Sequence, residues 1–497
     1  MNKQLTRLAI VSVLLLVALV AATTYWQAWA SGGLQSREDN AIQRVVQFTI
    51  ERGLIETGPK AIFAANHKVK RNGQTLFFRL YPQHKLAAQT IGYSTASRSQ
   101  AGLEKSMNDY LTGSNTNLSN AFKSAFDKLG GGTVKGNSLL LTLKPGAQRI
   151  AQQQLGSRCG AVVAMNVHTG AVYVMASTPS FDPNQISTNY AKVLKIRGDC
   201  GEGFALLNRA TSGLYTPGST FKIITAAAAL DSGAYTPTST FDDPGYCTEY
   251  GQKVSNANNP DQTAESYGHV DLAQGFQHSI NSVFCNIGMK IGAKVILDYA
   301  KRFGFYKTPP LETPADERAP SGLYKYTKTG RRVLDDPKDP SSVDPGRLAF
   351  GQTTMLATPL QMAMVAATVG NGGVVPKPYV VQKIVAPDGS TVRETHSGNL
   401  GRAIKPETAA ELTQMMIAVV QAGTGTAAQI PGIQVAGKTG TAETGVNHIY
   451  TAWFVAFAPA DNPQFAVAVV LEKQANGFGG AVAAPIAKAV LESLLHG

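Results

Sequence analysis

A serine and a lysine three residues apart are the first side chains in this sequence that could carry out chemistry. Ser219 and Lys222 lie where a helix is predicted over residues 220–230. Residues i and i+3 share one face of a helix, so the Lys222 amine can face the Ser219 hydroxyl. A serine hydroxyl needs a base beside it to act as a nucleophile, and a buried, neutral lysine could be that base. Alone the pair is weak evidence, because a serine at a helix start is usually only an N-cap.

Two further motifs follow this pair along the chain. Ser279-Ile280-Asn281, taken alone, predicts no more than a turn and a helix start. Gly437-Lys438-Thr439-Gly440-Thr441 lies on a predicted strand, where a lysine is normally a solvated surface residue. The glycines around Lys438 and Thr439 would let the backbone of a substrate come close. The order SxxK, SxN, KTG is more specific than any one of the three motifs.

In this order the motifs resemble those of penicillin-binding proteins and serine β-lactamases. The resemblance covers nearly the whole chain, and its further parts are the segments 160–184, 207–222, 350–363 and 452–459 and the turn Gly102-Leu103-Glu104. The sequence is most similar to the short PbpA-type group of class B penicillin-binding proteins. These are monofunctional D,D-transpeptidases. The resemblance implies a cell-wall enzyme that cross-links peptidoglycan stem peptides through a serine acyl-enzyme and is a target of β-lactams.

The resemblance also implies the catalytic residues. Ser219 would attack the penultimate D-alanine carbonyl of a stem peptide, and Lys222 would take its proton. Ser279, with Lys438, would pass a proton to the leaving amine. The backbone N–H groups of Ser219 and Thr441 would form the oxyanion hole, where each donor typically contributes about 2.7–4 kcal/mol.

The substrate-binding residues follow from the same resemblance. Asn281 would hold the peptide amide. Thr439 and Thr441 would hold the terminal carboxylate beside the Lys438 charge, with Gly440 between the two threonines. The sequence contains no phosphate-binding loop or metal-spaced cluster, so we expect no cofactor.

The elements that must position these residues are predicted to form an α+β domain. Strands are expected at 160–165, 171–176, 433–441, 452–458 and 465–471, with helices at 148–155, 359–367 and 485–495. Hairpins at both ends without alternating βα units favour a five-stranded antiparallel sheet flanked by helices. We assign residues 138–497 to this transpeptidase domain and residues 31–137 to a pedestal, or dimerisation-like, domain.

The N-terminus predicts a membrane anchor. Lys3 and Arg7 precede an apolar run from Leu8 to Ala22, which favours a cytoplasmic tail over 1–7 and a transmembrane segment over 8–30. The alternative is a cleaved signal peptide, because Ala28-Trp29-Ala30 has the small-x-small form of a cleavage site. The first reading gives a single-pass cell-membrane protein, and both put the catalytic domain outside the cytoplasm.

The charge pattern indicates which classes of partner the protein could bind. The net charge is +12, but Lys and Arg are scattered and form no block typical of nucleic-acid binding, so we expect no nucleic-acid partner. A basic surface suits anionic lipids or acidic wall polymers. The family resemblance adds a glycan-polymerising partner and proteins of division or elongation.

Four cysteines lie in the exported part, where two disulfides can form. We expect Cys247–Cys285, which would tie a turn-rich loop to the helix after Asn281. The remaining pair, Cys159–Cys200, would tether the first hairpin to the approach to Ser219. Free buried thiols are the alternative.

Other functions share these motifs. A serine β-lactamase would need a base that activates water, and Glu443 is the one candidate, with a Glu-x-x-x-Asn spacing to Asn447. That spacing occurs after the KTG motif, whereas a class A β-lactamase carries its glutamate before it. A membrane-anchored D,D-carboxypeptidase is a second alternative, and a catalytically idle scaffold or β-lactam sensor is a third.

Overall fold

The structure is a computed structural model, and it describes residues 2–25, 48–58, 61–71, 73–95, 99–114, 133–201, 203–256, 265–329, 332–446 and 448–496. At its centre lies a five-stranded antiparallel sheet in the order β20-β21-β22-β7-β8. The strands are β20 (Ala436–Glu443), β21 (Ile449–Ala458), β22 (Phe465–Ala475), β7 (Gly160–Asn166) and β8 (Val172–Thr178). The predicted sheet is therefore confirmed: the strands from the two ends of the domain meet where β22 pairs with β7.

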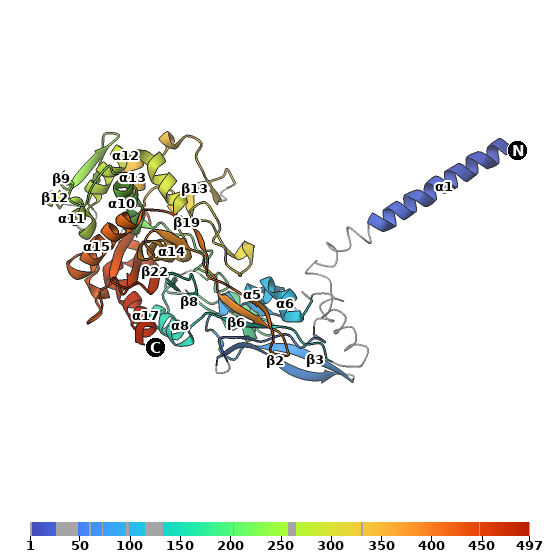
Figure 1. Ribbon diagram of the computed structural model, residues 1–497. Helices are drawn as coiled ribbons and strands as arrows, with labels where there is room; N and C mark the ends of the chain where they lie inside the picture. Colours follow the sequence, from blue (N-terminus) through green and yellow to red (C-terminus); the bar gives the residue numbers. More distant parts are fainter. Residues whose placement is uncertain are drawn as a thin grey trace.

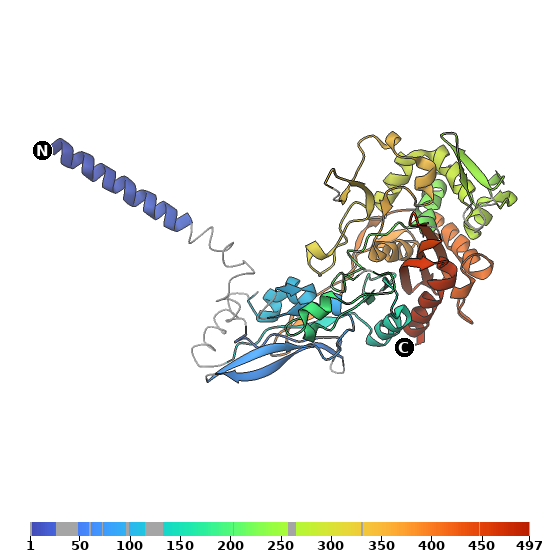
Figure 2. The ribbon, with the colours of Figure 1, turned by 180° about the vertical axis from the view of Figure 1, so that it is seen from behind.

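Helices cover both faces of this sheet (Figure 1). One face packs against α14 (Pro359–Gly370), and the other packs against α8 (Pro145–Leu155) and α17 (Ala484–His496). Figure 2 shows the C-terminal helix beside α8 from behind. Neighbouring residues of one strand enter different cores: Val163 packs on the α14 side and Val162 on the α17 side. Burial on both faces explains why these strands read as continuous apolar runs and not as alternating patterns.

A second group of helices carries two of the motifs. The 3₁₀ turn η3 (Gly218–Phe221) leads into α10 (Lys222–Asp231), all ten residues of which are buried. Ser219 thus lies on a 3₁₀ turn, and the α-helix begins at residue 222, two residues later than the predicted start at 220. α12 (Asn281–Arg302) and α15 (Pro406–Ala422) pack against α10, while α13 (Pro345–Ala349) packs against α12 and α11 (Leu272–Gln277) against α15.

Two small antiparallel strand pairs lie beside the start of α12. β9 (Thr240–Asp243) pairs with β12 (Gly268–Asp271), and β10 (Tyr246–Glu249) pairs with β11 (Gln252–Ser255). The Cys247–Cys285 disulfide links β10 to α12. The described chain also contains these short elements: β4 (Tyr93–Ser94), β5 (Gln100–Ala101), α9 (Tyr190–Leu194), β13 (Gly322–Tyr326), β14 (Arg332–Leu334), β15 (Met355–Leu356), β16 (Val374–Pro376), β19 (Asn399–Arg402) and α16 (Gly479–Val482).

A six-stranded sheet forms the pedestal, in the order β18-β17-β6-β1-β2-β3. Its strands are β1 (Ile55–Glu56), β2 (Ile62–Arg71), β3 (Gln74–Leu80), β6 (Ser138–Leu141), β17 (Val381–Val385) and β18 (Thr391–Glu394). In Figure 1 the orange strands, late in the sequence, lie in the same region as the blue ones, and in the sheet β17 pairs with β6. The sheet therefore joins strands from both sides of the boundary that the sequence suggests at residue 138, and the division into 31–137 and 138–497 stays a prediction.

The pedestal is held together around a buried carboxylate. Glu104, at 0% exposure, accepts from Arg52 at 2.9 Å and from Arg79 at 2.6 Å. It lies in α5 (Gly102–Ser106), between α4 (Ala88–Ile91) and α6 (Asn108–Thr112). The N–H of Gly102 in turn donates to both carboxylate oxygens of Glu317, at 3.0 and 3.2 Å. Glu317 belongs to the long segment between the second and third motifs, so the pedestal and the catalytic region share direct contacts.

The N-terminal helix α1 (Asn2–Thr24) stands apart from both sheets (Figure 1). Its stretch Thr6–Thr24 has a mean hydropathy of 2.3, and none of it is buried. By length and composition this helix could cross a membrane; a signal sequence would have the same features. The end of the predicted anchor, residues 26–30, lies outside the described residues.

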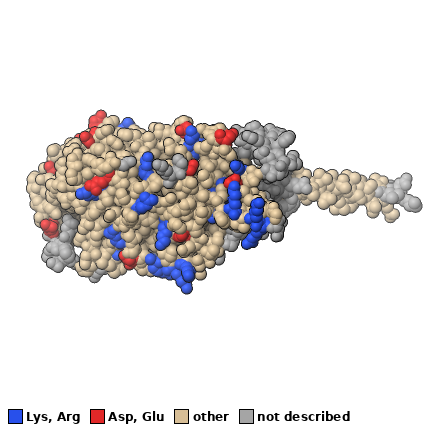
Figure 3. All heavy atoms as spheres, turned by 90° about the horizontal axis from the view of Figure 1, so that it is seen from below, with Lys and Arg blue, Asp and Glu red and all other residues tan. Residues whose placement is uncertain are grey.

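Lys, Arg, Asp and Glu are interspersed on the face in Figure 3, and the basic side chains there form several small groups and no single stripe.

Candidate active site

Side chains from all three motifs meet beside the start of α12. Lys438 Nζ on β20 donates to Ser279 Oγ at 2.8 Å. Lys222 Nζ on α10 donates to Ser279 O at 2.6 Å and to Asn281 Oδ1 at 2.8 Å, with Ser279 Oγ 3.4 Å away. The Ser279 hydroxyl therefore lies between the two amines. For the Ser219 hydroxyl, no hydrogen bond to another described residue is found, so the Lys222 amine is engaged with the second motif in this structure.

The backbone around Ser219 is fixed from three sides. Tyr215 exchanges two backbone hydrogen bonds with Ala357, at 3.1 and 2.8 Å. The Trp453 indole N–H donates to Thr216 O at 3.0 Å. The N–H of Gly218 donates to Gly351 O at 3.1 Å. Ser219 itself is half-buried, so its hydroxyl is on a fixed turn that a substrate can still reach.

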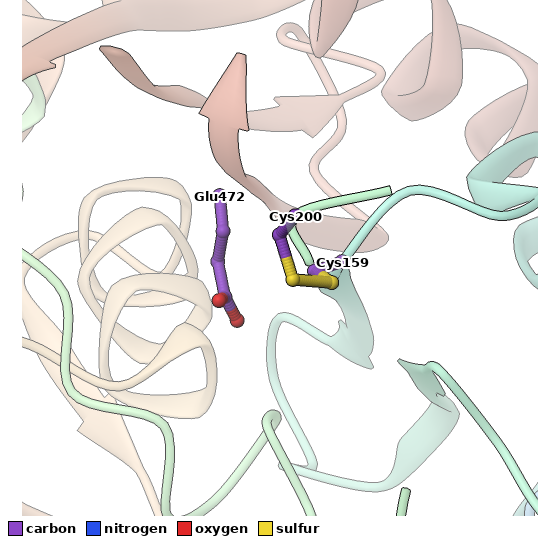
Figure 4. Close-up of side chains that lie close together, drawn as sticks. All are labelled: Cys159, Cys200 and Glu472. Carbon is purple, nitrogen blue, oxygen red and sulfur yellow. A yellow bond between two sulfur atoms is a disulfide. The ribbon is translucent and has the colours of Figure 1, made fainter. Parts of the chain in front are cut away.

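A buried ion pair holds the segment that leads into the Ser219 turn. The Glu472 carboxylate accepts from Arg209 Nε and from the Tyr215 hydroxyl, each at 2.7 Å. Figure 4 shows Glu472 beside the Cys159–Cys200 disulfide. These two cysteines and Glu472 are the one group of described residues with metal-ligand spacing. Because the two sulfurs are bonded to each other, neither offers a thiolate, and Glu472 alone could act as a ligand.

The glycines of the third motif have a different role from the one we inferred from the sequence. A Cβ at Gly440 would lie 2.9 Å from Pro217 O and 2.8 Å from Thr220 Cγ2, and one at Gly437 would lie 2.6 Å from Phe454 Cζ. Both glycines thus make room for the protein itself. The absence of a side chain at Gly440 lets β20 pack directly on η3. This packing brings Gly218, next to Ser219, close to Thr441: a Cβ at Gly218 would lie 3.0 Å from Thr441 O. The oxyanion hole formed by the N–H groups of Ser219 and Thr441 stays a prediction.

The two lysines are fully buried, which changes their chemistry. Burial, with the nearby Lys438 charge as the second cause, holds the pKa of Lys222 well below its usual value. Burial lowers the pKa of Lys438 to about 7. Two ammonium groups around one hydroxyl would repel each other. Near neutral pH, Lys222 is therefore the amine that is free to accept a proton, and Lys438 is the one that can carry charge.

Asn281 and Ser279 lie at the start of α12. Asn281 is buried and is the first residue of the helix. Ser279 has φ = 61°, in the left-handed region that a non-glycine residue rarely adopts. This turn places Ser279 O and Oγ toward Lys222 and Lys438. A strained backbone at such a place is typical of functional sites.

The threonines of the third motif make contacts that the sequence did not suggest. Thr439 Oγ1 lies 2.6 Å from Thr424 Oγ1, in the loop after α15. Thr441 Oγ1 accepts from the N–H of Gly479 at 3.2 Å. The run Gly423-Thr424-Gly425 indicates a tight loop, but nothing in its composition points to the third motif.

Glu443, the one candidate for a water-activating base, is exposed at the end of β20. Its residue pairs with Tyr450 in the β20–β21 ladder. The partner in the proposed Glu-x-x-x-Asn spacing, Asn447, lies outside the described residues.

Comparison with known proteins identifies the family. Residues 160–492 match the penicillin-binding protein transpeptidase domain, and residues 52–139 match the penicillin-binding protein A dimerisation domain. The chain belongs to the penicillin-binding protein transpeptidases. The match to the first family alone covers more than half of the chain.

Two relatives are similar in sequence to this penicillin-binding protein along nearly their whole length. The peptidoglycan D,D-transpeptidase PbpA of Mycolicibacterium smegmatis is 34% identical over 100% of this chain and 99% of its own. PbpA of Mycobacterium tuberculosis is 33% identical over 100% of both chains. The structure of penicillin-binding protein A from M. tuberculosis as an imipenem acyl-enzyme complex has a TM-score of 0.77 and 30% identity, covering 91% of this chain and 100% of that one.

Proposed function

We propose that this penicillin-binding protein is a peptidoglycan D,D-transpeptidase that cross-links stem peptides and is inhibited by β-lactams. The observation that carries the proposal is the meeting of Lys222, Ser279, Asn281 and Lys438 beside the Ser219 turn, with Lys222 buried and its pKa strongly lowered. The names of the full-length relatives support the same reaction. The acyl-enzyme complexes of the M. tuberculosis protein support a covalent β-lactam adduct.

In the first half-reaction, Ser219 Oγ attacks the penultimate D-alanine carbonyl and transfers its proton to neutral Lys222. The carbonyl oxygen becomes an oxyanion held by the N–H groups of Ser219 and Thr441. The C–N bond then breaks. The proton passes through Ser279 to the leaving nitrogen, so D-alanine departs as a neutral amine and an ester remains on Ser219.

In the second half-reaction, the amine of another stem peptide attacks this ester. The attacking amine gives one proton to the Lys222–Ser279 pair and the new amide bond forms. The Ser219 ester bond then breaks, and the pair passes that proton to Ser219 Oγ. Before the first half-reaction, the donor stem peptide is held by Asn281 at its amide. Its terminal carboxylate is held by Thr439 and Thr441, with Gly440 between them and the Lys438 charge beside them.

We further propose that α1 anchors the protein in the cell membrane as a single-pass helix, with residues 1–7 in the cytoplasm and the catalytic domain outside. Residues 8–30 would be the membrane segment, 31–137 the pedestal and 138–497 the transpeptidase domain. A glycan-polymerising enzyme and division or elongation proteins would be its partners.

The deciding experiment uses Ser219→Ala and labelled penicillin. The wild-type chain should gain one penicilloyl group by intact-mass spectrometry, and the variant should gain none while keeping its melting temperature. The adduct should last many minutes, and nitrocefin turnover should stay below about 1 s⁻¹, the low end of ordinary enzymes. An adduct on the Ser219→Ala variant would show that Ser219 is not the nucleophile. Fast turnover that Glu443→Gln removes would make the protein a β-lactamase.

A further inference from the structure

The start of α12, which carries the second motif, lacks a cap of its own. Its N-cap residue is Ile280, whose side chain cannot accept a hydrogen bond, and no side-chain cap bond is present. The first N–H groups of a helix need acceptors, and Ser, Thr, Asp or Asn usually supply them locally. Here the acceptor comes from outside the helix: the Ser282 N–H donates to Asn256 Oδ1 at 2.9 Å.

Behind Asn256 and Ser282 lies a buried carboxylate. Asp243, on β9, is 2% exposed. Its Oδ1 accepts from Ser282 Oγ at 2.6 Å and from the Gly245 N–H at 2.8 Å. Its Oδ2 accepts from Asn256 Nδ2 and from the Tyr267 N–H, each at 2.9 Å. Within the described part of the chain it has no ion-pair partner, so these donors and the positive end of α12 are what stabilise its charge.

This network is directly continuous with the lysine site. Asn281, next to Ser282, donates through Nδ2 to Ser255 O at 3.3 Å, beside Asn256. The other end of the same amide, Oδ1, accepts from Lys222 Nζ at 2.8 Å. The left-handed Ser279 lies two residues before Asn281, so the same helix start holds both acceptors of the Lys222 amine.

We propose that Asp243 is a positioning residue for the reaction: through Asn256 and Ser282 it caps α12 from outside and holds Asn281 and Ser279 against Lys222. It does not touch the reacting atoms. The inference rests on the proposed function, because it assigns to Asp243 the task of holding the proton-transfer groups of that reaction.

The arrangement of donors explains why a carboxylate is needed at this position. An asparagine offers one oxygen and one NH₂ group. Whichever way its amide turned, the NH₂ would face an N–H donor, either that of Gly245 or that of Tyr267. A buried donor without an acceptor destabilises its surroundings. The helix start would shift, and the Ser279 and Asn281 acceptors would move away from Lys222.

The test measures the rate of acylation by a labelled penicillin as a function of pH in the full-length wild-type chain and two variants. Asp243→Asn should acylate about 10- to 100-fold more slowly, the loss expected when a reacting group is misplaced by an ångström. Ser282→Ala, a milder change that removes one hydroxyl, should be slowed less. The double variant should be no slower than Asp243→Asn alone, because both changes break the same link between Asp243 and the start of α12.

A matched control separates positioning from general destabilisation. Asp231, the last residue of α10, is also a buried aspartate; it accepts from Tyr299, Thr408 and the Lys405 N–H. Asp231→Asn should lower the melting temperature to a similar degree and leave acylation within about twofold. In Asp243→Asn the acid limb of the rate profile should also move to lower pH, because lost acceptors disfavour the Lys222 ammonium.

The outcomes distinguish the two proposals. If wild type is acylated on Ser219 and both the Asp243 and the Ser282 variants react at its rate and with its pH profile, Asp243 has no positioning role and the proposed function stands. If the Asp231 control slows as much as the Asp243 variant, the effect is general destabilisation and the inference is wrong. If wild type forms no adduct at all, the proposed function fails and the inference fails with it.

Discussion

Lys222 and Lys438 direct two buried amines at the Ser279 hydroxyl, and their shared environment sets the expected pH dependence. The pKa of Lys222 is well below its usual value, mainly through burial. Below that pKa the amine is protonated and cannot take the proton of Ser219, so the acylation rate should fall as pH falls. Lys222→Arg should lose acylation as fully as Lys222→Ala, by roughly 100-fold or more, because arginine cannot give up its proton. Stopped-flow acylation between pH 5 and 9 checks this, and a flat profile or an active arginine variant would contradict it.

Lys438 should also leave a signature in stability. Its pKa is about 7 in the folded protein, against about 10.4 in an unfolded chain. Between these values the unfolded chain binds more protons, so the free energy of unfolding should rise as pH increases from 7 to 10. Lys438→Met should remove the part of this rise that Lys438 contributes, roughly 3–5 kcal/mol, and keep the part that comes from Lys222, while abolishing acylation. Urea unfolding of both proteins at pH 7 and pH 10 measures the difference, and equal slopes with pH would argue against a depressed Lys438 pKa.

At the scale of elements, the sequence predicted what local patterns specify. The five strands, their antiparallel pairing and the helices on the sheet faces follow from apolar runs and turn residues. The cap of α12 could not be predicted, because Ile280 carries no capping signal. The acceptor comes from Asn256, which lies 24 residues before Ile280 in the sequence. For the same reason β17 was not predicted as a pedestal strand: its partner β6 lies far away in the sequence.

The site was predicted to the extent that it consists of motifs. The three motifs, through the family resemblance that they carry, predicted Ser219, Lys222, Ser279, Asn281, Lys438, Thr439 and Thr441 as site residues. Asp243 and Thr424 carry no such signal, since Asp243 stands in a stretch whose composition indicates only a turn. The sequence also suggested a different reason for the glycine at position 440, namely access for a substrate. In the structure Gly440 makes room for η3, and this contact joins two segments that are distant in the sequence.

The two disulfides allow a matched comparison of elements. Cys247–Cys285 and Cys159–Cys200 close loops of similar length, with separations of 38 and 41 residues. Replacing either pair by serine should therefore cost about 4 kcal/mol in the chain-entropy model. Loss of Cys247–Cys285 should also slow acylation, because it frees β10 from α12, whereas loss of Cys159–Cys200 leaves the Arg209–Glu472 ion pair in place. Equal acylation rates in the two variants would show that β10 does not support the second motif.

At the scale of the whole molecule, the shared sheet determines what can fold alone. β6 pairs with β1 on one side and β17 on the other, and Leu139, Leu141 and Ile384 are nearly fully buried there. A fragment of residues 138–497 would keep β6 and β17 but lose β1, β2 and β3. Its β6 edge and apolar face would then be exposed, which favours aggregation. The half-buried Glu317 carboxylate would also lose its hydrogen bond from the Gly102 N–H.

We therefore expect the pedestal and the catalytic region to unfold as one unit. A chain that starts at residue 48 keeps every strand of both sheets, and it should be monomeric with a single melting transition. The 138–497 fragment should melt several degrees lower, aggregate on size-exclusion chromatography and acylate more slowly per folded molecule. Glu317→Gln in the longer chain is the finer test, since it keeps the strands and weakens only the contact with Gly102. It should lower the melting temperature slightly without changing oligomeric state. A soluble 138–497 fragment with the melting temperature and acylation rate of the longer chain would mean that the pedestal strands add no stability to the catalytic region.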